Sequence, residues 1–240
     1  MSAEATGLVH VLDDDADVRE SLGSVLRAEG FAVRMHATPQ GFLDAYDRAS
    51  PSCLLLDIRL QQADGLAVQD HLRRRDIPVP VILMTGHGDV PMAVRGMKAG
   101  AVDFLAKPFS DVALLAALAT ALERDAARCA DAASILALRQ RHDSLTPREK
   151  EVAALVAAGL MNKQIGFELA LEVSTVKIHR GQVMRKMAAG SLADLVRMVE
   201  RLALRPSGIG RHARPSRTAA RPGGNPDGRS ETGRSPTDRD

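Results

Sequence analysis

The first 125 residues alternate short apolar runs with segments that have the periodicity of amphipathic helices. The runs are Leu8–Leu12, Phe31–His36, Cys53–Leu56, Val79–Met84 and Ala101–Leu105. This regular β–α alternation predicts a parallel sheet with helices on both faces. The first, third and fourth runs are almost wholly apolar, as expected of central strands, whereas Arg34 in the second run fits an edge strand. We therefore predict a doubly wound α/β domain of five parallel strands over residues 1–125.

The rest of the chain has a helical pattern and then loses its apolar residues. Residues 126–143 are rich in Ala, Leu and Arg and contain no Gly or Pro, which favours a helical linker. Residues 144–204 predict an all-α domain of four helices, the first with Thr146 as N-cap and Glu149 completing a capping box. The other three helices are expected near Asn162–Leu169, Ser174–Met187 and Leu192–Leu204. Residues 205–240 are Arg-, Pro- and Gly-rich with few apolar side chains, so this basic tail is expected to be disordered.

Composition and charge narrow the class of protein. With only two cysteines, Cys53 and Cys129, a disulfide framework or cysteine metal cluster is not expected. The sequence lacks an apolar stretch of the ~18 residues that a membrane helix needs, and its start lacks the basic region of a signal peptide. These features predict a cytoplasmic protein. Residues 1–141 are acidic, with 15 Lys/Arg and 19 Asp/Glu. Residues 142–204 have 9 Lys/Arg and 7 Asp/Glu, and residues 205–240 have 8 Arg and 4 Asp/Glu, so both segments are basic. Different partners are therefore expected for the acidic and the basic half.

Polar side chains follow four of the five apolar runs. Asp13 and Asp14 follow the first run, Asp57 the third, Thr85 the fourth and Lys107 the fifth. Because the carboxyl ends of parallel strands meet at one edge of a sheet, these groups are expected to converge there. Carboxylates this close repel one another unless a cation lies between them, and hard oxygen ligands suit Mg²⁺. A carboxylate at such a site can attack phosphorus and form an aspartyl phosphate, while the metal and the lysine neutralise charge.

Each of these residues also has a simpler explanation. An acidic run before a helix is often only an N-cap, and Asp15 or Asp17 is expected to have that role. A single Asp or Lys after a strand is usually a solvated loop residue, so only the coincidence at four strand ends favours a functional site. Residues 86–88 lack the Lys and Ser/Thr of a phosphate-binding loop and the complete dinucleotide fingerprint. His10 and His87 have no Cys or His at ligand spacing and are expected to be structural.

Residues 8–125 resemble the receiver domain of two-component response regulators, and TGHGDVPMAVRGMKAGAVDFLAKPF (85–109) is particularly similar to the FixJ type. The resemblance implies a flavodoxin-like fold with Asp57 as the phosphoacceptor. It further implies that Asp57, Asp13, Asp14 and the backbone carbonyl of Arg59 bind Mg²⁺. Thr85 and Phe104 are implied as the switch pair, and Lys107 as the residue that contacts the phosphoryl group. The Lys107–Pro108 peptide bond is expected to be cis. The loop Leu60–Gly65 lacks the proline that members usually have, and it is expected to be looser.

A second pattern concerns the helices near Asn162–Leu169 and Ser174–Met187. The short turn between them suits a pair that places its second helix in a DNA major groove. Taken alone, STVKIHRGQVMRKM is more often an amphipathic helix with a solvated basic face. LTPREKEVAALVAAGLMNKQI and TVKIHRGQVMRKM, however, resemble the LuxR-type helix-turn-helix of FixJ and NarL regulators over about sixty residues. The resemblance implies base contacts by Lys177 and Ile178, and contacts nearer the DNA backbone by Lys163, Thr175, His179 and Arg180.

Together these features predict a response regulator that acts as a transcription factor and not as an enzyme. The expected partners are a sensor histidine kinase as phosphodonor, double-stranded DNA, and a second copy of the chain after phosphorylation, with RNA polymerase as a further candidate. Phosphorylation of Asp57 is expected either to unmask the DNA-binding domain or to promote dimerisation. Two alternatives stay open. One is an interaction protein whose receiver binds its partner without phosphorylation, and the other is a metal-dependent phosphohydrolase with Asp57 as nucleophile, which leaves residues 144–204 unexplained.

Overall fold

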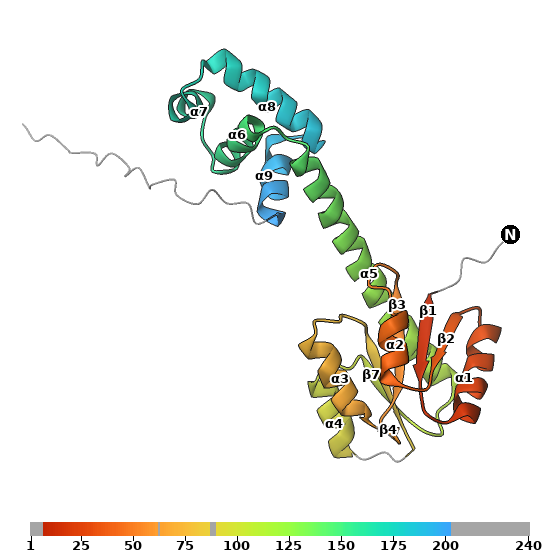
Figure 1. Ribbon diagram of the computed structural model, residues 1–240. Coiled ribbons are helices and arrows are strands. Elements are labelled where there is room, and N and C mark those ends of the chain that lie inside the picture. The colour runs from red at the N-terminus through yellow and green to blue at the C-terminus, as the bar shows by residue number, and fades with distance from the viewer. Residues whose placement is uncertain (1–6, 62, 87–89, 203–240) are drawn as a thin grey trace, which may run out of the picture. The chain divides into compact units, whose positions relative to one another are not determined.

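Five strands of the N-terminal half form one parallel sheet in the order β2-β1-β3-β6-β7 (Figure 1). They are β1 (Leu8–Leu12), β2 (Ala32–His36), β3 (Ser52–Asp57), β6 (Val81–Thr85) and β7 (Asp103–Ala106). This order confirms the flavodoxin-like, doubly wound fold, and β2 lies at an edge as its Arg34 predicted. The computed structural model describes residues 7–61, 63–86 and 90–202, so the expectations for His87 and for the tail 205–240 lie outside the described residues.

Helices cover both faces of this sheet. They are α1 (Ala16–Ala28), α2 (Pro39–Ala45), α3 (Gly65–Arg74), α4 (Val90–Lys98) and α5 (Asp111–Asp143). α1 and α5 pack on the face where Leu55 and Ile82 are buried, and α2, α3 and α4 pack on the face where Leu54 and Leu56 are buried. Because successive side chains of a strand point to opposite faces, a strand covered on both sides must be apolar throughout. This explains the unbroken apolar runs.

A short antiparallel ribbon follows the third strand of the sheet, and the sequence pattern did not predict it. Its strands are β4 (Arg59–Leu60) and β5 (Ala63–Asp64). Asp64 then caps α3 by accepting a hydrogen bond from the backbone N of Leu66. A Cβ atom at Gly65 would lie 2.4 Å from the backbone oxygen of Asp57, so only glycine fits between α3 and the end of β3. The described residues of this segment form a paired ribbon and a tight helix start, and the expected looseness stays a prediction.

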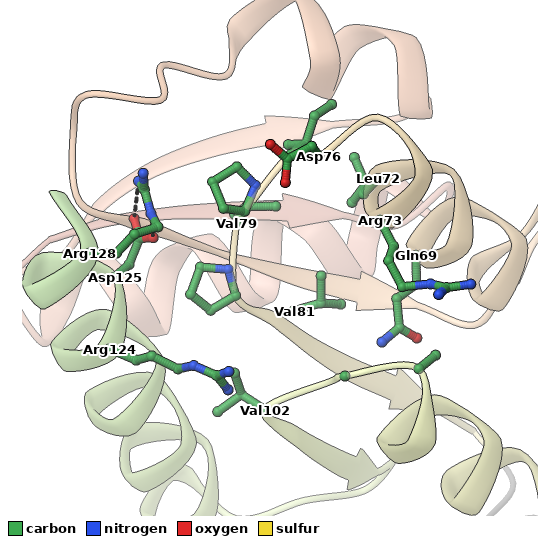
Figure 2. A pocket seen from close by; sticks show the side chains of 15 residues that line it. Gln69, Leu72, Arg73, Asp76, Val79, Val81, Val102, Arg124, Asp125 and Arg128 are labelled. Carbon is green, nitrogen blue, oxygen red and sulfur yellow. Dashed lines mark hydrogen bonds and ion pairs between the residues drawn. The ribbon is translucent and has the colours of Figure 1, made fainter. Parts of the chain in front are cut away.

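The last helix of the α/β domain continues without a break into the expected linker. The sequence predicted a separate helical linker over residues 126–143, whereas those residues are the second half of α5, a single helix of 33 residues. Asp125 lies in its middle and is buried, accepts a hydrogen bond from the backbone N of Ser52 and pairs with Arg128 (Figure 2). Arg128 also donates to the backbone oxygen of Arg48. These contacts fasten α5 to the start of β3, and no sequence pattern indicated them.

The C-terminal helices confirm the predicted four-helix domain. They are α6 (Pro147–Ala157), α7 (Asn162–Leu169), α8 (Val173–Met187) and α9 (Leu192–Arg201). The capping box of Thr146 and Glu149 is present as predicted. Between α7 and α8 the chain turns through Ala170, whose φ is 50°, while Gly166 leaves room for the backbone oxygen of Leu171. Among the helices of the described residues, none is both long and apolar enough to cross a membrane.

Candidate functional site

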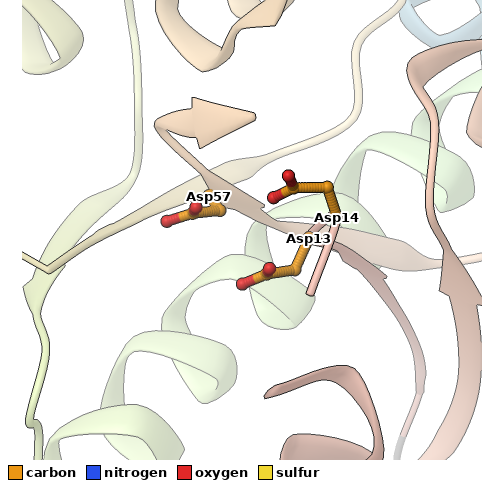
Figure 3. A group of neighbouring side chains, drawn as sticks. All are labelled: Asp13, Asp14 and Asp57. Carbon is orange, nitrogen blue, oxygen red and sulfur yellow. The ribbon is translucent and has the colours of Figure 1, made fainter. Parts of the chain in front are cut away.

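Three carboxylates meet where the first and third strands of the chain end (Figure 3). Asp13, Asp14 and Asp57 each place a carboxylate oxygen within 4.8 Å of the others. β1 and β3 are parallel neighbours, and the last register pair between them joins Leu12 to Leu56, so Asp13 and Asp57, the next residues of each chain segment, lie side by side. Asp13 and Asp57 are buried and Asp14 is half-buried. The structure thus brings together the three acids that the sequence had placed at separate strand ends.

Lys107 adds an ammonium group to these acids. Its Nζ lies 2.8 Å from Oδ2 of Asp13 and 3.3 Å from Oδ1 of Asp57. The backbone N of Lys107 donates to the backbone oxygen of Thr85, which holds this residue beside the end of β6. The Lys107–Pro108 peptide bond is cis, as the sequence resemblance implied. Burial opposes the charge of Lys107, but its hydrogen bond to Asp13 and the negative charge of Asp57 outweigh burial and raise the pKa of Lys107.

Among the described residues, the only cation that pairs with this group of acids is Lys107. Burial raises the pKa of Asp57, and the nearby charge of Asp13 acts in the same direction against the attraction of Lys107. Three carboxylates facing one ammonium group leave an excess of negative charge, which a divalent cation among the oxygens would offset. Mg²⁺ prefers hard oxygen ligands of this kind, so the donor set fits Mg²⁺.

Two loops hold the acids in this arrangement. Oδ2 of Asp14 accepts a hydrogen bond from the backbone N of Gln61, which joins the β1–α1 loop to the ribbon after β3. Oδ1 of Asp13 accepts from the backbone N of Asp15, and Asp15 in turn is the N-cap of α1, as expected. The acids are therefore positioned by backbone groups as well as by the strands, which restrains carboxylates that would otherwise move apart.

The other predicted residues of the acidic site lie around this group. Thr85 is buried at the end of β6, next to Met84, which is the register partner of Asp57. Phe104 is partly buried on β7 opposite Leu83, so it lies on the same face of the sheet as Thr85. Arg59 begins β4 two residues after Asp57, and its side chain is exposed. The structure therefore brings Asp13, Asp14, Asp57 and Lys107 into contact at this edge, while the roles of Thr85, Phe104 and Arg59 stay predictions.

In α8, the candidate recognition helix, most of the exposed side chains lie in the first two turns. Lys177 and Ile178 of α8 are exposed, and Ile178 has 64% of its surface accessible. Thr175, His179 and Arg180 are partly exposed on the same helix, whereas Val176 is fully buried against α7 and α6. Lys163 is exposed near the start of α7. An isoleucine this exposed gains little from packing within the chain, and a major groove offers apolar thymine methyl groups as contacts.

Two basic side chains of the same helix are held by partners within the domain. Nη1 of Arg180 donates a hydrogen bond to Oδ1 of Asn162 at the start of α7. Nζ of Lys186 lies 2.6 Å from Oε2 of Glu149, and this hydrogen bond lowers the pKa of Glu149. The sequence resemblance implied a contact of Arg180 near the DNA backbone, and it gave no partner within the domain for either side chain. The structure shows instead that Lys186 joins α8 to α6, and that Arg180 joins α8 to α7.

Two parts of the chain match known protein families. Residues 9–119 match the response regulator receiver domain, and residues 143–199 match the luxR family of bacterial regulatory proteins. Nodulation protein W of Bradyrhizobium diazoefficiens is 46% identical over 202 residues, 84% of this chain and 89% of that protein. Transcriptional regulatory protein FixJ of Rhizobium meliloti is 43% identical over 190 residues, 79% of this chain and 93% of that protein. The solved structure of response regulator StyR is 42% identical and superposes with a TM-score of 0.72 over 81% of this chain and 98% of that chain.

Proposed function

Since this chain belongs to the FixJ-type response regulators, the transcription regulators of two-component systems, we propose that phosphorylation of Asp57 controls its binding to DNA. The observation that carries the proposal is the position of Asp57 between two further carboxylates and the ammonium of Lys107. A carboxylate without this surrounding charge would form an acyl phosphate only with difficulty. In this position Lys107, and a divalent cation held by the acids, would stabilise the negative charge of the product.

In the proposed step a carboxylate oxygen of Asp57 attacks the phosphorus of a phosphohistidine on the sensor kinase. An O–P bond forms, the P–N bond breaks, and the leaving imidazole takes a proton from solvent. Lys107 lies 3.3 Å from Asp57 and is placed to pair with an oxygen of the transferred group. Asp13, Asp14 and Asp57, with the backbone carbonyl of Arg59, would hold the Mg²⁺ ion, which supplies positive charge to the phosphoryl oxygens when bound.

The kinase needs a surface beside Asp57 to deliver its phosphoryl group. A hollow of about 390 Å³ adjoins Lys107 and is lined by Val18 and Leu22 of α1 and by Phe109. Its apolar side chains are next to the charged group, so a docked helix would bring its histidine close to Asp57. We place the kinase contact there.

We further propose that Thr85 and Phe104 transmit phosphorylation to the surface of α4. Thr85 would move towards the new phosphoryl group, and Phe104, on the same face of the sheet, would turn inward. α4 carries Val94 and Met97, each with 45% of its surface accessible, and these side chains suit contact with a second copy of the chain. Two linked DNA-binding domains would then bind two half-sites, so weak single contacts reinforce one another.

The proposed division of the chain has a receiver over residues 1–125 and a helical linker over 126–143. The DNA-binding domain covers 144–204 and is followed by a basic tail over 205–240. Lys177 and Ile178 would contact bases, while Lys163, Thr175, His179 and Arg180 would contact the DNA backbone. A protein with these partners would act in the cytoplasm, and RNA polymerase would be a further partner at promoters.

Intact-mass measurement tests the proposal directly. The full chain is incubated with Mg²⁺ and acetyl phosphate, and its mass and its affinity for promoter DNA are measured. The wild-type chain should gain one phosphoryl group and bind DNA more tightly, Asp57→Asn should do neither, and Asp44→Asn, an exposed acid of α2, should behave as wild type. Labelling without a change in DNA affinity would favour an interaction protein. Continuous release of phosphate without a labelled chain would favour a phosphohydrolase, and the absence of both would refute the assignment of Asp57.

A further inference from the structure

Asp14 differs from the other two acids of the site in the kind of group that meets its charge. The ammonium of Lys107 lies 2.8 Å from Oδ2 of Asp13 and 3.3 Å from Oδ1 of Asp57, and these are its only ion pairs among the described residues. Oδ2 of Asp14 instead accepts a hydrogen bond from the backbone N of Gln61 at 3.0 Å. In the described part of the chain this is the only hydrogen bond to the Asp14 carboxylate. A backbone amide, and not a side chain, therefore positions this acid.

The amide of Gln61 is held in place by the antiparallel ribbon after β3. β4 pairs with β5 in this ribbon, and Gln61 comes directly after β4. At the base of the ribbon, the backbone N of Gly65 donates to the backbone oxygen of Ile58 at 2.8 Å. A donor that is anchored in this way has a fixed direction, and a hydrogen bond to it restricts the rotation of the acceptor. The ribbon therefore fixes the orientation of the Asp14 carboxylate across 47 residues of sequence.

Residue 61 can donate this hydrogen bond only because it is not a proline. The loop Leu60–Gly65 lacks the proline that members of the family usually have, and a proline has no N–H. The bond engages Oδ2 of Asp14 and leaves Oδ1 without a partner among the described residues, so Oδ1 is available to a cation. Hydrogen-bond partners that orient a metal ligand contribute roughly 10–100-fold to metal affinity. The amide of Gln61 has the position of such a partner.

We propose that the backbone N–H of residue 61 is a positioning group for Mg²⁺ at the acidic site. It fixes the orientation of the Asp14 carboxylate before the metal arrives, and it offsets part of the one charge that Lys107 does not meet. Less ordering of the ligands is then needed when the metal binds. The inference rests on the proposed function, because the Mg²⁺ ion serves phosphorylation of Asp57. Its first consequence is for metal binding itself, which needs no phosphodonor.

The first test measures the hydrogen bond in the metal-free chain and leaves residue 61 unchanged. In the ¹⁵N-labelled full chain, the amide of Gln61 should exchange with deuterium about tenfold more slowly than an unprotected amide. Asp14→Ala should remove this protection, whereas the amide of Gly65, which bonds the backbone oxygen of Ile58, should keep its own. Unprotected exchange at Gln61 in the wild-type chain, or equal protection in Asp14→Ala, would overturn the proposal.

The second test measures Mg²⁺ affinity by calorimetric titration of the unphosphorylated full chain. Gln61→Pro removes the N–H and should bind Mg²⁺ about tenfold more weakly. Leu60 lies in a β-strand, the conformation that a residue before proline favours, and protection of the Gly65 amide shows whether the ribbon is retained. Gln61→Ala is the matched control, because it removes the side chain and keeps the N–H, and it should bind Mg²⁺ as the wild type does. Equal affinity in the two variants, or tighter binding in Gln61→Pro, would contradict the proposed role.

A third measurement separates this inference from the proposed function. The rate of mass gain with acetyl phosphate is followed over a series of Mg²⁺ concentrations. Gln61→Pro should need about tenfold more Mg²⁺ for its half-maximal rate, and saturating Mg²⁺ should restore the rate. A loss that saturating Mg²⁺ does not restore would show that the N–H acts other than through the metal. If the wild-type chain gains no mass at any Mg²⁺ concentration, the assignment of Asp57 fails, whereas a tenfold difference between Gln61→Pro and Gln61→Ala in calorimetry would still support the positioning role.

Discussion

His10 of β1 and His36 of β2 form a side-chain pair inside the receiver domain. Nδ1 of His10 lies 2.9 Å from Nε2 of His36, and the rings stack at a centroid distance of 5.2 Å. Phe42 packs edge-on against both rings. The prediction that His10 is structural agrees with this packing, although its partner His36 was not identified, since the two are 26 residues apart in the sequence.

The histidine pair should make stability depend on pH. Burial, together with the charges of His36 and Arg34, lowers the pKa of His10 from 6.5 to about 4. As pH falls from 6.5 towards 4 the unfolded chain binds a proton that the folded chain does not, so the free energy of unfolding should decrease by up to ~1.4 kcal/mol per pH unit. Urea unfolding at several pH values measures this slope.

A variant separates the histidine pair from other titrating groups. His10→Leu should reduce the slope between pH 6.5 and 4. Val9→Ala removes a buried side chain of the same strand and should lower stability by the same amount at every pH. An unchanged slope in His10→Leu would show that other groups determine the acid sensitivity.

Gly65 is the second residue whose role follows from local geometry. A Cβ atom there would lie 2.4 Å from the backbone oxygen of Asp57 and 2.7 Å from Cα of Ile58, and neither atom can move without displacing β3. Gly65→Ala should therefore lower the free energy of unfolding by about 1–3 kcal/mol and slow phosphorylation of Asp57. Denaturant unfolding and the rate of mass gain with acetyl phosphate measure the two effects.

The matched control for Gly65 is another helical glycine. Outside the backbone of its own helix, a Cβ atom at Gly181 of α8 would meet none of the described residues within 4 Å. Gly181→Ala should therefore stabilise the helix by up to ~1 kcal/mol and leave phosphorylation unchanged. Normal phosphorylation in Gly65→Ala would contradict the view that this contact fixes the acceptor.

At the scale of elements, the DNA-binding domain is held together by polar contacts between helices. Glu149 caps α6 through the backbone N of Thr146 and also pairs with Lys186 of α8. The bond to Lys186 lowers the pKa of Glu149, so its contribution to stability is present above the unfolded pKa of the group and is lost as pH falls through the lower folded pKa. One side chain therefore fixes both the start of α6 and the position of α8.

Loss of this side chain should weaken the domain at neutral pH. Glu149→Ala removes the cap and leaves Lys186 without its partner, and we expect the free energy of unfolding to fall by about 1–3 kcal/mol. Thermal unfolding at pH 7 measures the change. Glu151→Ala is the control, because Glu151 is exposed and pairs only with Arg148 among the described residues. A loss of equal size in both variants would contradict the structural role of Glu149.

Two residues of α8 should differ in what they contribute to DNA binding. Lys177 is exposed and free to reach a base edge, so Lys177→Ala should reduce base preference by about 1–3 kcal/mol at one position. Arg180 also bonds Asn162, so Arg180→Ala should weaken binding to every sequence, reduce the salt dependence and lower the melting temperature. Titrations with promoter and random DNA at several salt concentrations compare the two. Equal effects on both DNAs for both variants would remove the assignment of Lys177 as a base contact.

At the scale of the whole molecule, phosphorylation should change the oligomeric state. Sedimentation of the full chain with Mg²⁺ and acetyl phosphate should show a monomer becoming a dimer, with DNA affinity rising in parallel. Met97→Glu should prevent the dimer by placing a charge on the exposed face of α4, whereas Val112→Glu, at an exposed apolar residue of α5, should not. A phosphorylated species that stays monomeric yet binds DNA tightly would favour unmasking of the DNA-binding domain instead.

The sequence by itself determined the α/β domain, the four-helix domain and the residues that end each strand. A strand that is buried on both faces must be apolar, so Leu54 and Leu56 indicate a buried strand from the sequence alone. A helix start needs a capping group, so Thr146 likewise indicates where α6 begins. Strand ends of a parallel sheet share one edge, so Asp13, Asp57 and Lys107 could be grouped from the order of the runs alone. These inferences need only the periodicity of the chain and the topology that it imposes.

Only the tertiary structure decided which groups meet across long stretches of sequence. Asp125 bonds Ser52 across 73 residues, and Lys186 bonds Glu149 across 37. The neighbouring sequence does not indicate such partners. A charged residue in a helix has the same sequence context whether its side chain faces solvent or bonds a distant backbone group. The unpaired Oε1 of Gln69 is likewise visible only when its whole environment is in place. The periodicity of the sequence specifies which face of a helix or strand is buried. Only the tertiary packing determines which hydrogen-bond or charge partner each polar group has.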